Sequence, residues 1–193
     1  GSMHAMGGEH QLGDFVKGPL PAGLPRALAS GVALHRAIDG FADRHPAFMA
    51  SRARISPLRR RVGGVLVDLF YDHLLARDWG DYCPEPLDAY TARLYAALSA
   101  HTGALPERAH EIADLMRRND WLGSYRNVAA VGRAIDRMAV YRLSRTNPLG
   151  GGIEEFLADA AGFEADFRAF LPDALAFACA WRAARAEGFS ATP

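Results

Sequence analysis

Apolar side chains recur three or four positions apart along most of the chain, as they do on one face of an α-helix. Between Leu24 and Asp43, for example, such a stripe contains Leu28, Val32, Leu34 and Ile38. No segment shows the sustained apolar–polar alternation between turns that is typical of a half-buried strand. The pattern predicts an all-α fold, a single-domain helical bundle of about seven helices.

Turn-forming residues divide this pattern into elements. A short helix is expected between His45-Pro46 and Arg54, and Ser56-Pro57 has the chemistry of an N-cap followed by a first-turn proline. Asn147-Pro148 with Gly150–Gly152 predicts a loop. The remaining helices are expected over about 58–79, 87–101, 106–119, 128–144, 153–170 and 172–187.

One helical domain is therefore expected over residues 1–193. Its last 41 positions, 153–193, should form a closing helical pair docked on the bundle, in preference to a second domain. Residues 1–8 are expected to be a tag or disordered, since Gly1-Ser2-Met3 resembles a vector-derived leader. The segment 8–23, rich in glycine and proline, predicts a loop.

The expected helix over 58–79 differs from the others because it is apolar on nearly every face between Val65 and Leu75. A helix of that kind belongs in the middle of a domain. It nevertheless carries Asp68, Asp72 and His73. Buried polar groups are normally paired, neutralised or bound to a metal, so this helix is the first place to look for a functional site.

Composition supports the fold class and narrows the function. The chain has 36 Ala and 21 Leu against 8 Val and 5 Ile, and Ala and Leu favour helices. Lys+Arg and Asp+Glu are 22 each, so a bulk nucleic-acid binder is not expected. Two cysteines without a CxxC motif indicate a reduced, cytoplasmic protein. No apolar run approaches the roughly 20 residues of a membrane span.

Carboxylates and imidazoles recur at helical spacing. His35 and Asp39 are four positions apart, as are Asp68 and Asp72, so each pair shares a helix face. Helical bundles form metal sites from nitrogen and oxygen donors on several helices, and this mix suits Mn²⁺, Fe²⁺, Mg²⁺ or Zn²⁺. The residues alone leave a purely structural pairing open, with partners such as Arg36, Arg44 and Arg54.

Several segments in this order carry a resemblance to a known family. They are Gly-Asp-Phe-Val-Lys-Gly at 13–18, Leu-His-Arg-Ala-Ile-Asp-Gly-Phe-Ala-Asp-Arg-His-Pro at 34–46, Val-Asp-Leu-Phe-Tyr-Asp-His-Leu-Leu at 67–75 and Asp-Trp-Leu-Gly-Ser-Tyr at 120–125. Together they resemble the acyl carrier protein phosphodiesterases, a family similar to the HD-domain metal phosphohydrolases. The resemblance implies an HD-like fold. It also implies hydrolysis of the phosphodiester that joins 4′-phosphopantetheine to a serine of acyl carrier protein.

The resemblance also implies roles for individual residues. The metal, expected to be Mn²⁺ with Mg²⁺ or Fe²⁺ as alternatives, would be held by Asp14, His35, Asp72 and His73. Asp39 or Asp68 could take a proton from the attacking water. Lys17 or Arg36 could stabilise charge on the phosphoryl oxygens. The products would be apo carrier protein and 4′-phosphopantetheine.

A run of arginines precedes the central helix and suggests how a protein substrate would dock. Acyl carrier proteins are strongly acidic, and complementary charge would speed their association. From the residues alone, a solvated helix start is the default interpretation of this run, and docking is the functional one. The residues are Arg52, Arg54, Arg59, Arg60 and Arg61.

Two other functions stay open at this stage. One is an HD-type phosphohydrolase that acts on a nucleotide or another small phosphoester. The other is a non-catalytic helical adaptor whose His–Asp pairs are structural. Activity assays on holo carrier protein and on a nucleotide panel distinguish the nucleotide phosphohydrolase from the carrier-protein enzyme. A measurement of metal binding distinguishes the adaptor from both enzymes.

Overall fold

The computed structural model describes residues 26–100, 114–141 and 147–190, and within these ranges every regular element is a helix. The all-α prediction is confirmed. The elements are α2 (Arg26–Ala42), α3 (Pro46–Arg54), the 3₁₀-helix η2 (Arg60–Val62), α4 (Gly63–Arg77), α5 (Trp79–Tyr82), α6 (Leu87–Ala100), α8 (Trp121–Ser124), α9 (Val128–Tyr141), α10 (Ile153–Ala158) and α11 (Ala160–Ser190).

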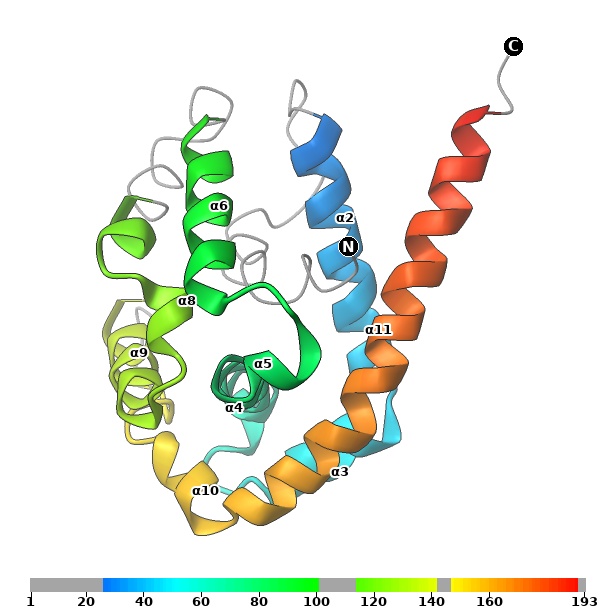
Figure 1. Cartoon of the computed structure of the whole chain (residues 1–193). Helices are drawn as coiled ribbons and strands as arrows, with labels where there is room; N and C mark the ends of the chain where they lie inside the picture. The colour runs from blue at the N-terminus through cyan, green and yellow to red at the C-terminus, as the bar shows by residue number, and fades with distance from the viewer. Residues whose placement is uncertain (1–25, 101–113, 142–146, 191–193) are drawn as a thin grey trace.

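Helix α4 lies at the centre of the bundle (Figure 1). It packs against α9 on one side and against α3 and α11 on another, while α2 runs beside α11 and α8 packs on α6. In the described ranges, no helix combines the length and the apolar character that crossing a bilayer requires.

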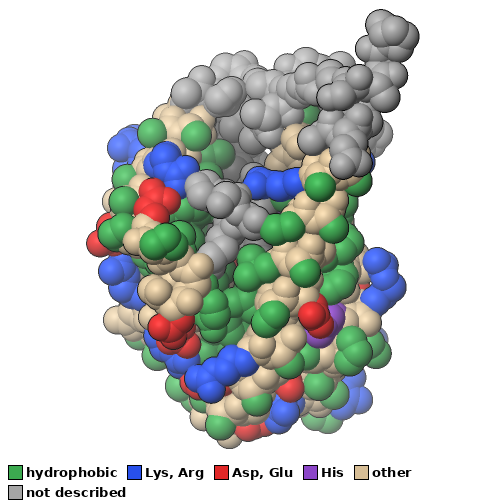
Figure 2. Space-filling view, turned by 45° about the vertical axis from the view of Figure 1, so that its right-hand side comes forward, with side chains coloured by type: hydrophobic (Ala, Val, Ile, Leu, Met, Phe, Trp, Pro, Cys, Tyr) green, Lys and Arg blue, Asp and Glu red, His purple; other side chains and the backbone are tan. Residues whose placement is uncertain are grey.

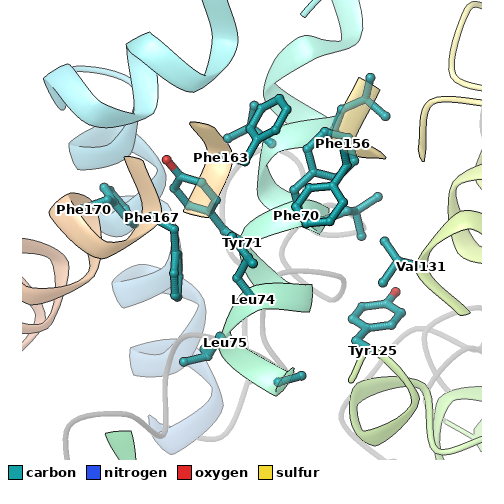
Figure 3. Close-up of a cluster of buried hydrophobic side chains, with 14 of the residues drawn as sticks. Phe70, Tyr71, Leu74, Leu75, Tyr125, Val131, Phe156, Phe163, Phe167 and Phe170 are labelled. Carbon is teal, nitrogen blue, oxygen red and sulfur yellow. The ribbon is translucent and has the colours of Figure 1, made fainter. Parts of the chain in front are cut away.

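The side chains of α4 are buried on nearly all sides, as its composition predicts. Leu66, Val67, Phe70 and Leu74 are completely inaccessible to solvent. Aromatic rings from several helices surround this helix (Figure 3): Phe70 packs against Phe156 and Phe163, whereas Tyr71 packs against Phe48, Phe167 and Phe170. Burial of this much apolar area is the main stabilising contribution to the fold.

The start of the central helix differs from the prediction. Ser56 does not cap it, because the Ser56 hydroxyl donates to Glu155 Oε1 at 2.6 Å and its amide donates to Oε2 at 2.9 Å. A turn and η2 follow, and α4 begins only at Gly63. Leu58, expected inside the helix, is 71% exposed. The helix ends at Arg77, and Trp79 begins α5.

The last two helices also divide at a different point. The predicted boundary at Pro172 is wrong, because α11 runs through Pro172 and bends along its length (Figure 1). The break occurs instead at Asp159, whose side chain accepts from the amide of Gly162 at 3.2 Å. That contact is N-cap chemistry, which begins a helix efficiently.

Other expectations agree with the structure or lie outside it. The helices expected after Leu24, His45, Pro86 and Asn127 are α2, α3, α6 and α9, and residues 147–152 form turns. Most of the helix expected over 106–119 lies outside the described residues. Residues 114–118, at the end of that segment, are helical. The described part contains these and nine further α-helices, against about seven expected for the chain, because α5, α8 and α10 are only four to six residues long.

Candidate active site

The imidazole of His73 is buried in the middle of the bundle. Its Nδ1 lies 2.7 Å from the carbonyl oxygen of Tyr125, and its ring packs edge-on against Phe156. A carbonyl oxygen only accepts, so Nδ1 carries the proton of this hydrogen bond. Burial lowers the pKa of His73, although the bond to Tyr125 opposes the shift. The ring is therefore neutral near pH 7, with a lone pair on Nε2.

Asp72 lies next to His73 on α4 but faces another direction. It is half-buried and lines a small cavity of about 20 Å³ with Trp79, Tyr90 and Tyr125. Tyr125 thus lines the same cavity as Asp72, and its carbonyl accepts from His73. Asp68, also half-buried, lies one turn before Asp72 on the same helix.

A larger opening adjoins this cavity. Its volume is about 370 Å³, and it shares Ala76, Trp79 and Leu87 with the small cavity that Asp72 lines. Arg77, Arg126 and Glu85 are the charged residues at its wall, and both arginines are ion-paired, Arg77 with Asp78 and Glu164 and Arg126 with Asp88. The opening therefore lies on the side of α4 that carries Asp72, with Ala76, Trp79 and Leu87 between the two spaces.

The other predicted imidazole lies on α2. His35 is 5% exposed, and its Nε2 lies 3.4 Å from Oδ2 of Asp39, whose side chain is 43% exposed. The i,i+4 spacing that predicts this contact therefore produces it. Arg36, the next residue on α2, is exposed.

The chemistry of these donors fits a divalent cation, although the described residues do not complete a site. A histidine ligand usually donates its second ring N–H to a carbonyl or carboxylate, as His73 does. No group of three or more His, Cys, Asp or Glu side chains in the described ranges is close enough to hold a metal ion. His35, Asp72 and His73 are described, and they do not form such a group. Asp14 and Lys17 lie outside the described residues, so the predicted four-ligand set remains a prediction.

Two members of the arginine run hold the bundle together. Arg54 donates to Asp166 at 2.8 Å and to Asp159 at 2.5 Å, which joins α3 to α11. Arg59 donates to Glu155 at 3.1 Å and to the carbonyl of Gly150 at 2.9 Å. Burial alone would raise the pKa of Glu155, but hydrogen bonds from Ser56 and Arg59 outweigh it and lower that pKa.

The remaining members of the run are more accessible. Arg52 forms an exposed ion pair with Asp43 at 3.1 Å. Arg60 and Arg61 are exposed, and no carboxylate of the described residues pairs with either. On the face drawn in Figure 2, positive and negative side chains lie interspersed.

Sequence reasoning missed the part that Tyr125 plays. Tyr125 is buried in the core. A backbone carbonyl, however, leaves no residue-specific signal in a sequence. The available signal is Asp120 followed three positions later by Gly123, a pairing that can form a capped turn.

These observations define a class of protein: an all-helical bundle in which buried imidazoles lie next to carboxylates. The family model of acyl carrier protein phosphodiesterases matches residues 4–174. A curated acyl carrier protein phosphodiesterase from Photorhabdus laumondii is 28% identical over 83% of this chain and 81% of its own length. The enzymes of the same name from Serratia proteamaculans and Salmonella dublin are 28% and 30% identical, over 83% and 66% of this chain and 83% and 67% of their own lengths.

The chain therefore belongs to the acyl carrier protein phosphodiesterase family, as its motifs predict. No solved structure matches it.

Proposed function

We propose that this protein hydrolyses the phosphodiester between 4′-phosphopantetheine and the serine of an acyl carrier protein, in the presence of a divalent cation. The products are apo carrier protein and 4′-phosphopantetheine. Membership of the family supports the substrate class. The observation that carries the chemistry is His73, a neutral buried imidazole whose Nδ1–H is committed to the Tyr125 carbonyl, next to Asp72.

The cation in this proposal is Mn²⁺, with Mg²⁺ or Fe²⁺ as alternatives. His73 Nε2, Asp72, His35 and Asp14 would hold it. A divalent ion bound there neutralises charge on the phosphoryl oxygens and lowers the pKa of water.

The chain's own residues would then move protons and stabilise charge. Water adds to phosphorus and the bond from phosphorus to the serine oxygen breaks, so one proton leaves the water and one reaches the serine. Asp39, half-exposed next to His35, or Asp68 on α4 can accept the water proton. Arg36 or Lys17 can stabilise the equatorial phosphoryl oxygens.

The docking surface in this proposal is the exposed part of the arginine run. Arg60 and Arg61 are available for an acidic partner, whereas Arg54 and Arg59 already hold carboxylates of the bundle. Arg52 on α3 is also exposed, and it pairs with Asp43. Exposed charges of this kind mainly raise the association rate and orient the partner.

The test is an intact-mass assay on holo carrier protein with Mn²⁺, run beside a nucleotide panel and a chelator-treated sample. The proposal expects loss of one phosphopantetheine group from the carrier and loss of activity with chelator. Turnover of a nucleotide alone would identify the second phosphohydrolase class and contradict the proposal. Absence of both turnover and metal binding would indicate an adaptor.

A further inference from the structure

The segment Asp120–Tyr125, which we call the 120–125 turn, ends at the carbonyl to which His73 donates its hydrogen bond. Its motif, Asp-Trp-Leu-Gly-Ser-Tyr, contributes no predicted ligand. The carbonyl of Tyr125 nevertheless accepts a hydrogen bond from the single N–H group of a neutral His73 ring. The orientation of that carbonyl therefore decides which ring nitrogen of His73 keeps a lone pair.

The carbonyl is available because α8 is short. The helix spans only Trp121–Ser124, and Tyr125 is its C-cap, with an amide that donates back to Gly123 and Leu122. Carbonyls at the end of a helix have no partner within it. The Tyr125 carbonyl is thus directed out of α8 and toward α4, where His73 donates a hydrogen bond to it.

The start of α8 is fixed by an unusual backbone conformation. Asp120 has φ 41° and ψ 55°, and it is the only residue other than glycine with a positive φ in the described ranges. Its Oδ1 accepts from the amide of Gly123 at 3.3 Å, and its carbonyl accepts from Ser124 at 2.8 Å. Strained backbone of this kind persists where the surroundings hold it in place, and it is concentrated at functional sites.

Gly123 is required by the same contact. A Cβ added to Gly123 would lie 2.1 Å from Oδ2 of Asp120, so any larger residue would displace the capping carboxylate. The cap formed by the Asp120 carboxylate therefore depends on a glycine at position 123.

A third group holds the turn from outside. The Tyr95 hydroxyl on α6 accepts from the amide of Leu122 at 2.9 Å, in a buried position. The Ser124 hydroxyl and the Arg126 guanidinium also bond carbonyls within the turn, at Trp121 and Gly123 respectively. The turn is consequently fixed at both ends and in its middle.

We propose that the 120–125 turn is a positioning device for His73. Asp120, Gly123 and Tyr95 are positioning residues that fix the Tyr125 carbonyl, and this carbonyl holds the imidazole in the Nδ1–H tautomer with Nε2 as the lone-pair nitrogen. The role of that nitrogen toward a metal rests on the proposed function, whereas the tautomer itself does not.

The experiment measures the His73 tautomer by imidazole ¹⁵N NMR in metal-free protein, with Mn²⁺ affinity measured by calorimetry alongside it. Asp120→Ala and Gly123→Ala should convert a single Nδ1–H tautomer into a mixture and weaken Mn²⁺ binding by about 10–100-fold. Asp120→Asn, which keeps an oxygen acceptor and tolerates positive φ, should restore both. Tyr95→Phe is the milder variant if the others fail to fold.

Leu98→Ala is the matched control, because Leu98 packs in the same cluster as Tyr95 and Leu122 but makes no hydrogen bond to the turn. It should lower thermal stability and leave the tautomer unchanged. An unaltered tautomer in Asp120→Ala and Tyr95→Phe would overturn the inference, as would an equal change in Leu98→Ala. A shifted tautomer in a protein that does not hydrolyse holo carrier protein would contradict only the proposed function.

Discussion

Nη1 of Arg59 lies 3.1 Å from Oε1 of Glu155, although 96 positions separate the two residues. Ser56 donates to the same carboxylate through its hydroxyl and its amide. This carboxylate therefore ties the turn before α4 to α10. The contact also gives a structural role to an arginine that was predicted to take part in a docking surface.

Replacing the carboxylate should measure that structural role. Glu155→Gln should lower the free energy of unfolding by roughly 1.5–3 kcal/mol, the range for charged hydrogen bonds. Because the pKa of Glu155 is lowered in the folded protein, this stabilisation is present above pH 4.5 and is lost as pH falls through the lowered pKa. Urea unfolding at pH 7 and at pH 3 checks both statements. Glu154→Gln, exposed on the same helix, is the control and should change stability by less than about 0.5 kcal/mol.

The exposed arginines should affect docking and leave chemistry intact. Arg60→Glu and Arg61→Glu should each raise KM for holo carrier protein while kcat stays near wild type, because exposed rim charges mainly alter association. The wild-type KM should also rise with salt through screening. Arg133→Glu, an exposed charge reversal on α9, is the matched control. A fall in kcat at constant KM would count against the docking surface.

Much of the core could be predicted because its signal is local. All-round apolarity between Val65 and Leu75 is sufficient to predict a buried helix, and α4 is buried. The i,i+4 spacing is sufficient to bring His35 to Asp39. Each of these predictions depends on residues within a few turns of one another, where helical geometry fixes the contacts.

The rest depended on contacts that no local pattern encodes. Ser56 is a residue type that favours the N-cap position, but its hydroxyl donates to Glu155 instead. Pro172 has the composition of a helix break, but Phe170, Leu171 and Ala174 are buried in the core on either side of it, and this packing stabilises a continuous α11. Tertiary contacts outweighed local propensity in both cases.

The junction between α4 and the 147–152 turn offers a pair of glycines with opposite expected effects. A Cβ on Gly152 would lie 2.5 Å from Leu66 and 2.8 Å from the carbonyl of Leu149. Gly152→Ala should therefore destabilise the protein by about 1–3 kcal/mol. Gly64, on α4, has nothing within 4 Å of such a Cβ, so Gly64→Ala should stabilise it by about 0.4–1 kcal/mol. Thermal unfolding of the two variants should give shifts of opposite sign.

His73 should also determine part of the acid sensitivity of the fold. Its pKa is lowered in the folded state, chiefly by burial and further by Arg77, against the effects of Tyr125, Asp78 and Glu164. The unfolded chain therefore binds one more proton than the native state between the lowered pKa and about 6.5, and stability falls as pH decreases through that window.

The check is the dependence of the unfolding free energy on pH between 7 and 5. His73→Gln, which cannot titrate, should reduce the slope by up to about 1.4 kcal/mol per pH unit. Equal slopes in wild type and variant would show that His73 does not titrate differently on folding.

The most direct test of the central claim compares wild type with Asp72→Asn in the intact-mass assay with Mn²⁺. The substitution keeps the shape of the side chain and removes its charge, which relieves the cost of burying that charge. Turnover of holo carrier protein should fall by more than about 100-fold, beyond what loss of a supporting contact causes, while the thermal unfolding midpoint stays close to that of wild type. Full turnover by Asp72→Asn would contradict the account.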